Sequence, residues 1–199
     1  MAGFNECQPD PAILARARRG DMKAHEVLYA SYGTPVYTLA VRMLGEPSLA
    51  EEILQETCIE IIRNVSGFRV DGAFGGWVKR IAVNKCLAHL RSAWHRKAQA
   101  LEPADDDEGA AWEPRSTDDP EAEATDGRDL ERALAELSPT ARAVVWLYDV
   151  EGYTHQEIAE LMGKTVSFSK SQLSRAHERL RELLGPDEVS TCTPLPNSC

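Results

Sequence analysis

Long apolar runs are missing from this sequence of 199 residues. No segment approaches the roughly 20 consecutive apolar residues that a membrane-spanning helix requires. The first ten residues are polar and lack the basic start and apolar run of a secretory signal peptide. We therefore expect a cytoplasmic protein without a membrane span of its own.

Cysteine is scarce, and the five residues (Cys7, Cys58, Cys86, Cys192 and Cys199) lack the paired spacing of a zinc site or a disulfide framework. The sequence also contains no glycine-rich phosphate-binding loop and no nucleophile elbow, and its five histidines are scattered. Nothing in the sequence is therefore suited to carry catalysis. We expect a protein that is not an enzyme, with no metal, no cofactor and no small-molecule substrate.

Basic residues are nearly missing from one segment, which holds the whole charge imbalance of the chain. Between residues 99 and 127 there are eleven acidic residues and one basic residue, Arg115, which accounts for the net charge of −10. Leu101 and Trp112 are the only large apolar residues of this segment. It cannot bury enough apolar surface to offset the entropy lost on ordering. We therefore predict an acidic disordered linker over residues 98–128, between two modules.

The module after the linker has the pattern of a helix-turn-helix. Ser138 followed by Pro139 predicts the start of one helix, with a serine cap and a proline in its first turn. Thr154 and Glu157 have the spacing of a capping box, which predicts the start of a second helix. Gly163 suits the turn before a third helix. The apolar positions expected to be buried on that third helix are Val166, Leu173, Ala176, Leu180 and Leu183.

The polar face of this third helix predicts contact with DNA. Between residues 164 and 181 there are five lysines and arginines and a single acidic residue. Such a local basic excess in an acidic chain favours DNA binding over the alternative, an ordinary helical bundle with a basic surface. The side chains suited to phosphates and base edges are Ser169, Lys170, Gln172, Ser174, Arg175 and Arg179.

The module before the linker is helical throughout by its apolar periodicity. Helices are expected after Asp10, after Asp21 and after Ser48, where residues 48–51 have the pattern of a second capping box. The helix after Ser48 has an apolar stripe of Ile53, Leu54, Cys58, Ile61 and Ile62. Its opposite face consists of Glu51, Glu52, Gln55, Glu56 and Glu60. This acidic face is either a solvated helix surface or a docking surface for a basic partner, and the residues alone leave both interpretations open.

A glycine-containing loop over residues 68–76 precedes a basic helix that we expect at about 77–97. This helix carries six lysines and arginines and no acidic residue. Phe68, Phe74 and Trp77 lie at its start. Aromatic rings beside a basic groove suit single-stranded nucleic acid, because bases stack on rings while cations follow the phosphates. The alternative, which we favour for Phe74 and Trp77, is that the rings belong to the core.

Three stretches together resemble the extracytoplasmic-function (ECF) sigma factors, the small two-domain initiation subunits of bacterial RNA polymerase. They read AEEILQET at residues 50–57, FGGWVKRIAVN at 74–84, and LSP at 137–139 with GYTHQEIA at 152–159. The resemblance implies an all-α fold of two small helical domains, an N-terminal bundle and a C-terminal helix-turn-helix. The boundaries we expect are a region 2-like domain at 10–97, the linker at 98–128, a region 4-like domain at 129–185 and a tail at 186–199.

The resemblance also implies a role for each face. Glu51, Glu52, Gln55 and Glu56 would bind core RNA polymerase. Phe68, Lys79, Arg80, Asn84 and Arg91 would open and read the −10 element of promoter DNA as a single strand with extruded bases. The third helix of the helix-turn-helix would read the −35 element in the major groove of the duplex. A further implied partner is an anti-sigma factor, which would hold the protein near the membrane when it is itself membrane-bound.

The sequence departs from the family pattern in two places. Where the family usually has Gly-Thr-Val-Lys-Ser-Arg at the start of its recognition helix, residues 167–172 read Ser-Phe-Ser-Lys-Ser-Gln. Ala88 stands where the family commonly has an acidic residue. The resemblance therefore does not carry the family's −35 sequence preference over to this chain. The competing hypothesis is a free-standing helix-turn-helix regulator, which would bind duplex DNA as a dimer without polymerase.

Overall fold

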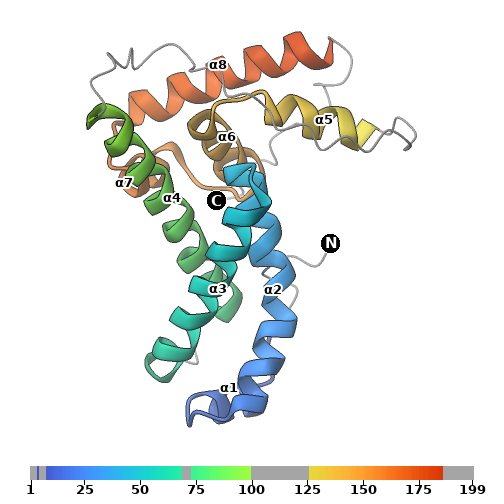
Figure 1. The fold of residues 1–199 in the computed structure, drawn as a ribbon, viewed down its shortest axis with the longest axis vertical. Helices are drawn as coiled ribbons and strands as arrows, with labels where there is room; N and C mark the ends of the chain where they lie inside the picture. Colours follow the sequence, from blue (N-terminus) through green and yellow to red (C-terminus); the bar gives the residue numbers. More distant parts are fainter. Residues whose placement is uncertain (1–3, 5–7, 69–72, 100–125, 186–199) are drawn as a thin grey trace, which may run out of the picture. The chain divides into compact units, whose positions relative to one another are not determined.

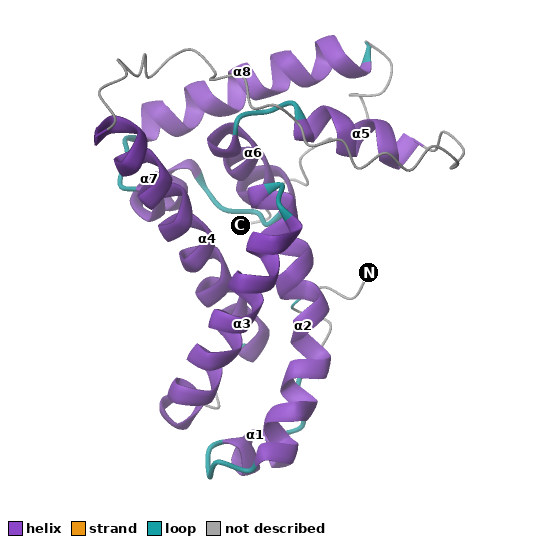
Figure 2. Cartoon of the chain, viewed as in Figure 1, coloured by secondary structure: helices purple, strands orange, loops and turns teal. Residues whose placement is uncertain are grey.

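The computed structural model describes residues 4, 8–68, 73–99 and 126–185, and every regular element within these ranges is a helix (Figures 1 and 2). The all-α class expected from the sequence is thus confirmed. The chain divides into two compact units, Met1–Ala93 and Trp94–Cys199. No helix in the described ranges is both long and apolar enough to cross a membrane. Most of the predicted linker at 98–128 and the whole of the predicted tail at 186–199 lie outside the described residues.

Four helices build the first unit, and two of them begin at aspartate caps as the sequence predicts. They are α1 (Pro11–Ala17), α2 (Met22–Leu44), α3 (Pro47–Asn64) and α4 (Phe74–Gln99), with a 3₁₀ turn, η1 (Val65–Gly67), after α3. The Asp10 carboxylate accepts a hydrogen bond from the Ala12 amide, and Asp21 accepts from the amides of the first turn of α2. α2 and α3 pack side by side along most of their length (Figure 1).

The expected capping box at the start of α3 is wrong. Glu46 occupies the N-cap position, and no side chain there accepts a hydrogen bond from the backbone. Ser48 donates its hydroxyl to the Glu46 carboxylate at 2.9 Å instead. Pro47 sets the start of the helix because its fixed φ suits the first helical position and its missing amide leaves no donor unsatisfied.

An aromatic cluster forms the centre of the first unit. The Phe74 ring lies 5.4 Å from that of Tyr32 on α2, 5.1 Å from that of Phe68 and 5.3 Å from that of Trp77, measured between ring centroids. Phe74 is fully buried, so the core interpretation is confirmed for this ring, whereas Trp77 is half-buried and keeps part of its ring exposed. Burying Phe74 draws three residues of the expected loop into α4, which begins there and not at Trp77.

The second unit has the helix boundaries that its local signals predict. Its elements are α5 (Asp126–Ala135), α6 (Pro139–Val145), a π-helical segment η2 (Trp146–Val150), α7 (His155–Met162) and α8 (Val166–Leu184). Ser138 caps α6, and both hydrogen bonds of the capping box between Thr154 and Glu157 are present. Gly163 takes a left-handed conformation with φ of 66° at the turn before α8. α4 and α5 both extend into the residues we assigned to the linker.

Helix α8 packs its buried face against α5, α6 and α7. Leu173, Ala176 and Leu180 are buried there as expected. Two other positions of the expected stripe are wrong, because Val166 is 40 % exposed and Leu183 is 39 % exposed. Both lie at the ends of the helix, where fewer neighbouring side chains cover them.

A buried arginine that the sequence analysis did not single out ties α5 to α6. The guanidinium of Arg142 donates from Nε to the Leu134 carbonyl at 2.8 Å, and from Nη2 to the carbonyls of Ala135 at 2.8 Å and Leu137 at 3.0 Å. These are carbonyls at and just beyond the C-terminal end of α5, where helices leave acceptors unsatisfied and favour cations. Burial lowers the pKa of Arg142 from its usual value.

Candidate nucleic-acid interface and docking surfaces

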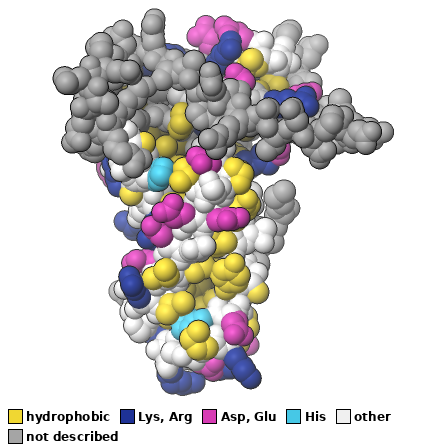
Figure 3. Space-filling model, in the orientation of Figure 1, with side chains coloured by type: hydrophobic (Ala, Val, Ile, Leu, Met, Phe, Trp, Pro, Cys, Tyr) yellow, Lys and Arg dark blue, Asp and Glu magenta, His cyan; other side chains and the backbone are white. Residues whose placement is uncertain are grey.

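The acidic strip of α3, which we define as Glu51, Glu52, Gln55 and Glu56, is exposed along its whole length. These positions follow the i, i+1, i+4, i+5 spacing that places side chains on one helix face. Figure 3 shows acidic side chains on the face of the molecule that carries α3. The Glu56 carboxylate also contacts the Lys85 ammonium of α4 at 3.1 Å. The strip therefore presents a concentrated negative charge that is only partly compensated within the unit.

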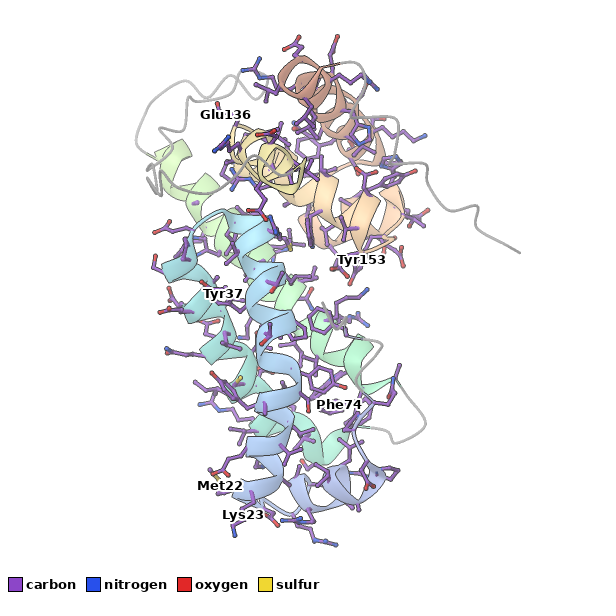
Figure 4. All side chains as sticks on the ribbon, turned by 90° about the vertical axis from the view of Figure 1, so that its right-hand side faces the viewer. Met22, Lys23, Tyr37, Phe74, Glu136 and Tyr153 are labelled. Atoms are coloured by element: carbon purple, nitrogen blue, oxygen red, sulfur yellow. The ribbon has the colours of Figure 1, made fainter. Side chains whose placement is uncertain are left out.

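An apolar groove of about 240 Å³ lies between α2 and α3. Several of its lining side chains are unusually exposed for their type: Met22 is 64 % exposed, Tyr29 55 % and Ile62 47 %. Hydrophobic side chains gather on this face in Figure 3, and Met22 is labelled at the start of α2 in Figure 4. Cys58 also lines the groove, and burial raises the pKa of its thiol. Ile62 was expected in the core and lies at the surface instead.

The basic helix α4 presents a stripe of polar side chains. Arg80, Asn84 and Arg91 are exposed, and their spacing of four and seven residues places them on one side of the helix. Lys79 flanks this stripe and is half-buried. The structure thus brings four of the five residues predicted for the −10 element onto α4.

Phe68, the fifth residue predicted for the −10 element, lies elsewhere. Its side chain is 9 % exposed and packs against Phe74, which is labelled in Figure 4 at the start of α4, and against Trp77. The expectation that Phe68 is available to stack on a base is therefore wrong for this conformation. Its ring instead packs the residue just after η1 against the first turn of α4.

Helix α8 exposes most of the residues predicted for the −35 element. Lys170, Ser174, Arg175 and Arg179 are exposed and Gln172 is half-buried. The Arg179 guanidinium contacts the Glu182 carboxylate at 3.0 Å one turn further on. Because α7, the turn at Gly163 and α8 form a helix-turn-helix, α8 is the element that would enter the major groove.

Ser169 is not on the exposed face of α8, and its prediction as a DNA contact is wrong. Its side chain is completely buried, and its hydroxyl lies 3.0 Å from Nδ1 of His155, the first residue of α7. The His155 ring stacks on Tyr148 with centroids 4.4 Å apart. Burial and the nearby charge of Lys170 lower the pKa of His155, against a smaller opposing effect of Asp149. The contact between His155 and Ser169 therefore joins α7 to α8.

A second contact joins α8 to the π-helical segment. His177 Nε2 lies 2.7 Å from the Asp149 carboxylate of η2. Together with the contact between His155 and Ser169, it holds α8 at two points, one against η2 and one against α7. The sequence analysis missed both contacts because each joins residues that are at least 14 positions apart in the chain.

Comparisons with known proteins assign each of the two units to a described protein family. The chain matches the family description Sigma-70 region 2 over residues 28–96 and Sigma-70, region 4 over residues 127–180. It is 31 % identical over 176 residues to the ECF RNA polymerase sigma factor SigM of Mycobacterium tuberculosis, covering 88 % of this chain and 85 % of SigM. It is 32 % identical over 176 residues to the RNA polymerase sigma factor CarQ of Myxococcus xanthus, covering 88 % of this chain and 98 % of CarQ.

The chain belongs to the ECF RNA polymerase sigma factors. This sigma factor is also 34 % identical over 173 residues to SigE of Mycolicibacterium smegmatis, where the match covers 85 % of this chain and 65 % of SigE. Among solved structures, the fold resembles the sigma factor RpoE of Bartonella quintana, crystallised with the anti-sigma factor NepR. The TM-score is 0.54 at 23 % identity, over 81 % of this chain and 97 % of RpoE.

Membership of the family sets the function in outline. An ECF sigma factor directs RNA polymerase to promoters through regions 2 and 4 and is not itself an enzyme. Region 2 corresponds to most of α2 together with α3 and α4, and region 4 to α5–α8. The competing hypothesis of a free-standing regulator does not account for the region 2 match.

Proposed function

We propose that this sigma factor uses one helix to bind polymerase and two other helices to recognise the promoter. The acidic strip of α3 binds core RNA polymerase, the polar stripe of α4 reads the −10 element as single-stranded DNA, and α8 reads the −35 element as duplex. The observation that carries this proposal is the distribution of charge: α3 exposes mainly carboxylates, whereas the described side chains of α4 include cations and no carboxylate, and α8 exposes more cations than carboxylates. A negative face suits a basic protein surface, and positive faces suit phosphates.

The stripe of α4 has the chemistry that strand opening needs. Arg80 and Arg91 are exposed at the two ends of the stripe, with Asn84 between them. Arginines hold the phosphates of the backbone, and an amide between them can donate to and accept from an extruded base. Because Phe68 is buried, base recognition in this proposal rests on α4 itself and on the half-buried Trp77.

Helix α8 offers both kinds of contact that duplex recognition requires. Lys170, Arg175 and Arg179 would hold the backbone phosphates and set the position of the helix in the groove. Gln172, about two turns before Arg179 and nearer the start of the helix, is placed to read a base edge through its amide. This assignment replaces the contact that we expected from Ser169.

An anti-sigma factor is the further partner that we propose, with an apolar helix seated in the groove between α2 and α3. The groove exposes Met22, Tyr29 and Ile62, and α3 carries both the groove and the acidic strip. An occupant would therefore hinder the binding of polymerase to that strip. In this proposal the sigma factor stays in the cytoplasm, near the membrane when its anti-sigma factor is membrane-bound.

Three single variants test the division of roles. Glu52→Lys should abolish binding to core polymerase, Asn84→Ala should impair promoter opening, and Arg175→Ala should weaken −35 binding and lower its salt slope by about one unit. Each is measured by three assays: co-elution with polymerase, permanganate reactivity of −10 thymines, and binding of the assembled holoenzyme to duplex promoter DNA. Glu160→Lys on α7, which makes the same charge change outside the strip, is the control. Equal losses in all three assays for all three variants would contradict the proposal.

A further inference from the structure

Phe168 is a bulky apolar residue close to the start of the recognition helix. It is the third residue of α8 and is half-buried, in contrast to Ser169 beside it, which is completely buried. The buried face of α8 consists of Ser169, Leu173, Ala176 and Leu180. Phe168 does not belong to that face, so the packing of the helix-turn-helix core does not account for an aromatic ring at this position.

The position of Phe168 matches that of the DNA-facing side chains. Phe168, Gln172, Arg175 and Arg179 follow one another at spacings of four, three and four residues, which places them on one side of the helix. In a helix-turn-helix, the residues near the start of the recognition helix approach the base edges most closely. Phe168 is therefore the first member of the stripe and the one nearest the bases.

A positive charge lies beside the ring. The Lys164 ammonium lies 5.4 Å from the centroid of the Phe168 ring. A cation over one face of the ring would hold a positive charge close to the phosphates that line a DNA groove. An apolar ring with a cation beside it suits a surface that meets DNA and not an apolar protein.

We propose that Phe168 reads a thymine of the −35 element through the C5-methyl group of that base. The thymine methyl is the one apolar group that base pairs display in the major groove, and phenylalanine is among the side chains that contact it. Phe168 is then a specificity-determining residue of this sigma factor. The inference rests on the proposed function, because it requires α8 to lie in the major groove at the −35 element.

Replacing thymine by deoxyuridine tests this directly, since the exchange removes the methyl group and leaves all hydrogen-bonding groups of the base in place. A −35 sequence is first selected from random duplexes with the holoenzyme, formed from bacterial core polymerase and the full chain. Each thymine of the selected −35 element is then replaced singly, on either strand. We expect one replacement to weaken holoenzyme binding about fourfold, the scale of losing one buried methyl group.

Variants of Phe168 identify the side chain responsible. Phe168→Ala should bind the thymine and deoxyuridine promoters equally, and Phe168→Leu should keep part of the difference because leucine retains apolar contact. Gln172→Ala is the matched control: it should weaken binding yet preserve the full difference. Circular dichroism and thermal unfolding confirm that each variant is folded.

The outcomes separate the inference from the function on which it rests. Equal binding of wild type to all thymine and deoxyuridine promoters, or a difference that persists in folded Phe168→Ala, would overturn the role of Phe168 while leaving the sigma function intact. A holoenzyme that selects no −35 sequence would overturn both.

Discussion

Replacing Arg142 by methionine should strongly destabilise region 4. Methionine is about as long as arginine and is apolar. The substitution therefore keeps most of the packing and removes the guanidinium. It deletes three hydrogen bonds of 2.8 to 3.0 Å from a charged donor to the carbonyls of Leu134, Ala135 and Leu137. Hydrogen bonds to charged groups each contribute about 1.5–3 kcal/mol, and buried carbonyls that lose their partner retain their desolvation cost.

The net loss is smaller than the sum of these three bonds, because the variant no longer has to bury a guanidinium. We therefore expect a loss of about 3–5 kcal/mol, a large part of the 5–15 kcal/mol that typical domains have. Arg142→Lys should recover only part of it, since one ammonium cannot replace a planar fork of donors.

Hydrogen exchange measured by mass spectrometry resolves the effect within the full chain. Peptides from α5, α6 and α8 should exchange much faster in Arg142→Met, whereas peptides from α2 and α3 should keep their protection. Arg175→Met, the same substitution at an exposed position of α8, is the control and should change little. A loss of protection in Arg142→Met equivalent to less than about 1 kcal/mol would refute the reasoning, since it lies below the range for even one charged hydrogen bond.

Three further predictions concern other side chains. Phe74→Ala should destabilise region 2 by about 3–5 kcal/mol, because it removes the ring at the centre of the aromatic cluster. Urea unfolding measures this loss of stability, and a loss below about 1 kcal/mol would count against the cluster as the core. The pKa of His155 is lowered in the folded protein. Its contribution to stability is therefore complete above pH 6.5, about the pKa of histidine in an unfolded chain, and is lost as the pH falls below that value. The difference in melting temperature between wild type and His155→Gln should therefore shrink between pH 7.5 and pH 5, and a difference that grows would contradict the assignment. Burial raises the pKa of Cys86 to about 12, so this thiol should resist iodoacetamide at pH 8 until the protein is unfolded. Mass spectrometry locates the labelled cysteine, and rapid labelling of Cys86 in the native protein would disprove its burial.

Local signals predicted the helix-turn-helix well. A cap or a glycine turn depends on residues within four positions of each other, so the starts of α6 and α7 and the turn at Gly163 could be predicted from the sequence. Ser48 shows the limit of such signals. Its pattern matched a capping box, but the helix begins at Pro47, two residues earlier than that box implies, and the hydroxyl of Ser48 contacts Glu46 instead.

Residue type was a weaker guide to the site than position along the helix. Ser169 looked like a DNA contact because serine is polar, yet it lies four residues before Leu173 on the buried face, and its partner His155 is 14 positions away. Phe68 was placed at the DNA surface, but its ring packs against Phe74, which begins α4 three residues before the expected start. Arg142 was missed because its acceptors are backbone carbonyls, which no residue type marks in the sequence.

In our proposal, this sigma factor binds core RNA polymerase through the acidic strip of α3. Co-elution of the purified chain with bacterial core polymerase on a sizing column tests this, with Glu52→Lys/Glu56→Lys compared against Glu160→Lys/Glu178→Lys. We expect a stable complex for wild type and for the region 4 control, and none for the strip variant, with circular dichroism showing all three to be folded. A strip variant that co-elutes as wild type does would contradict the proposed role of the strip.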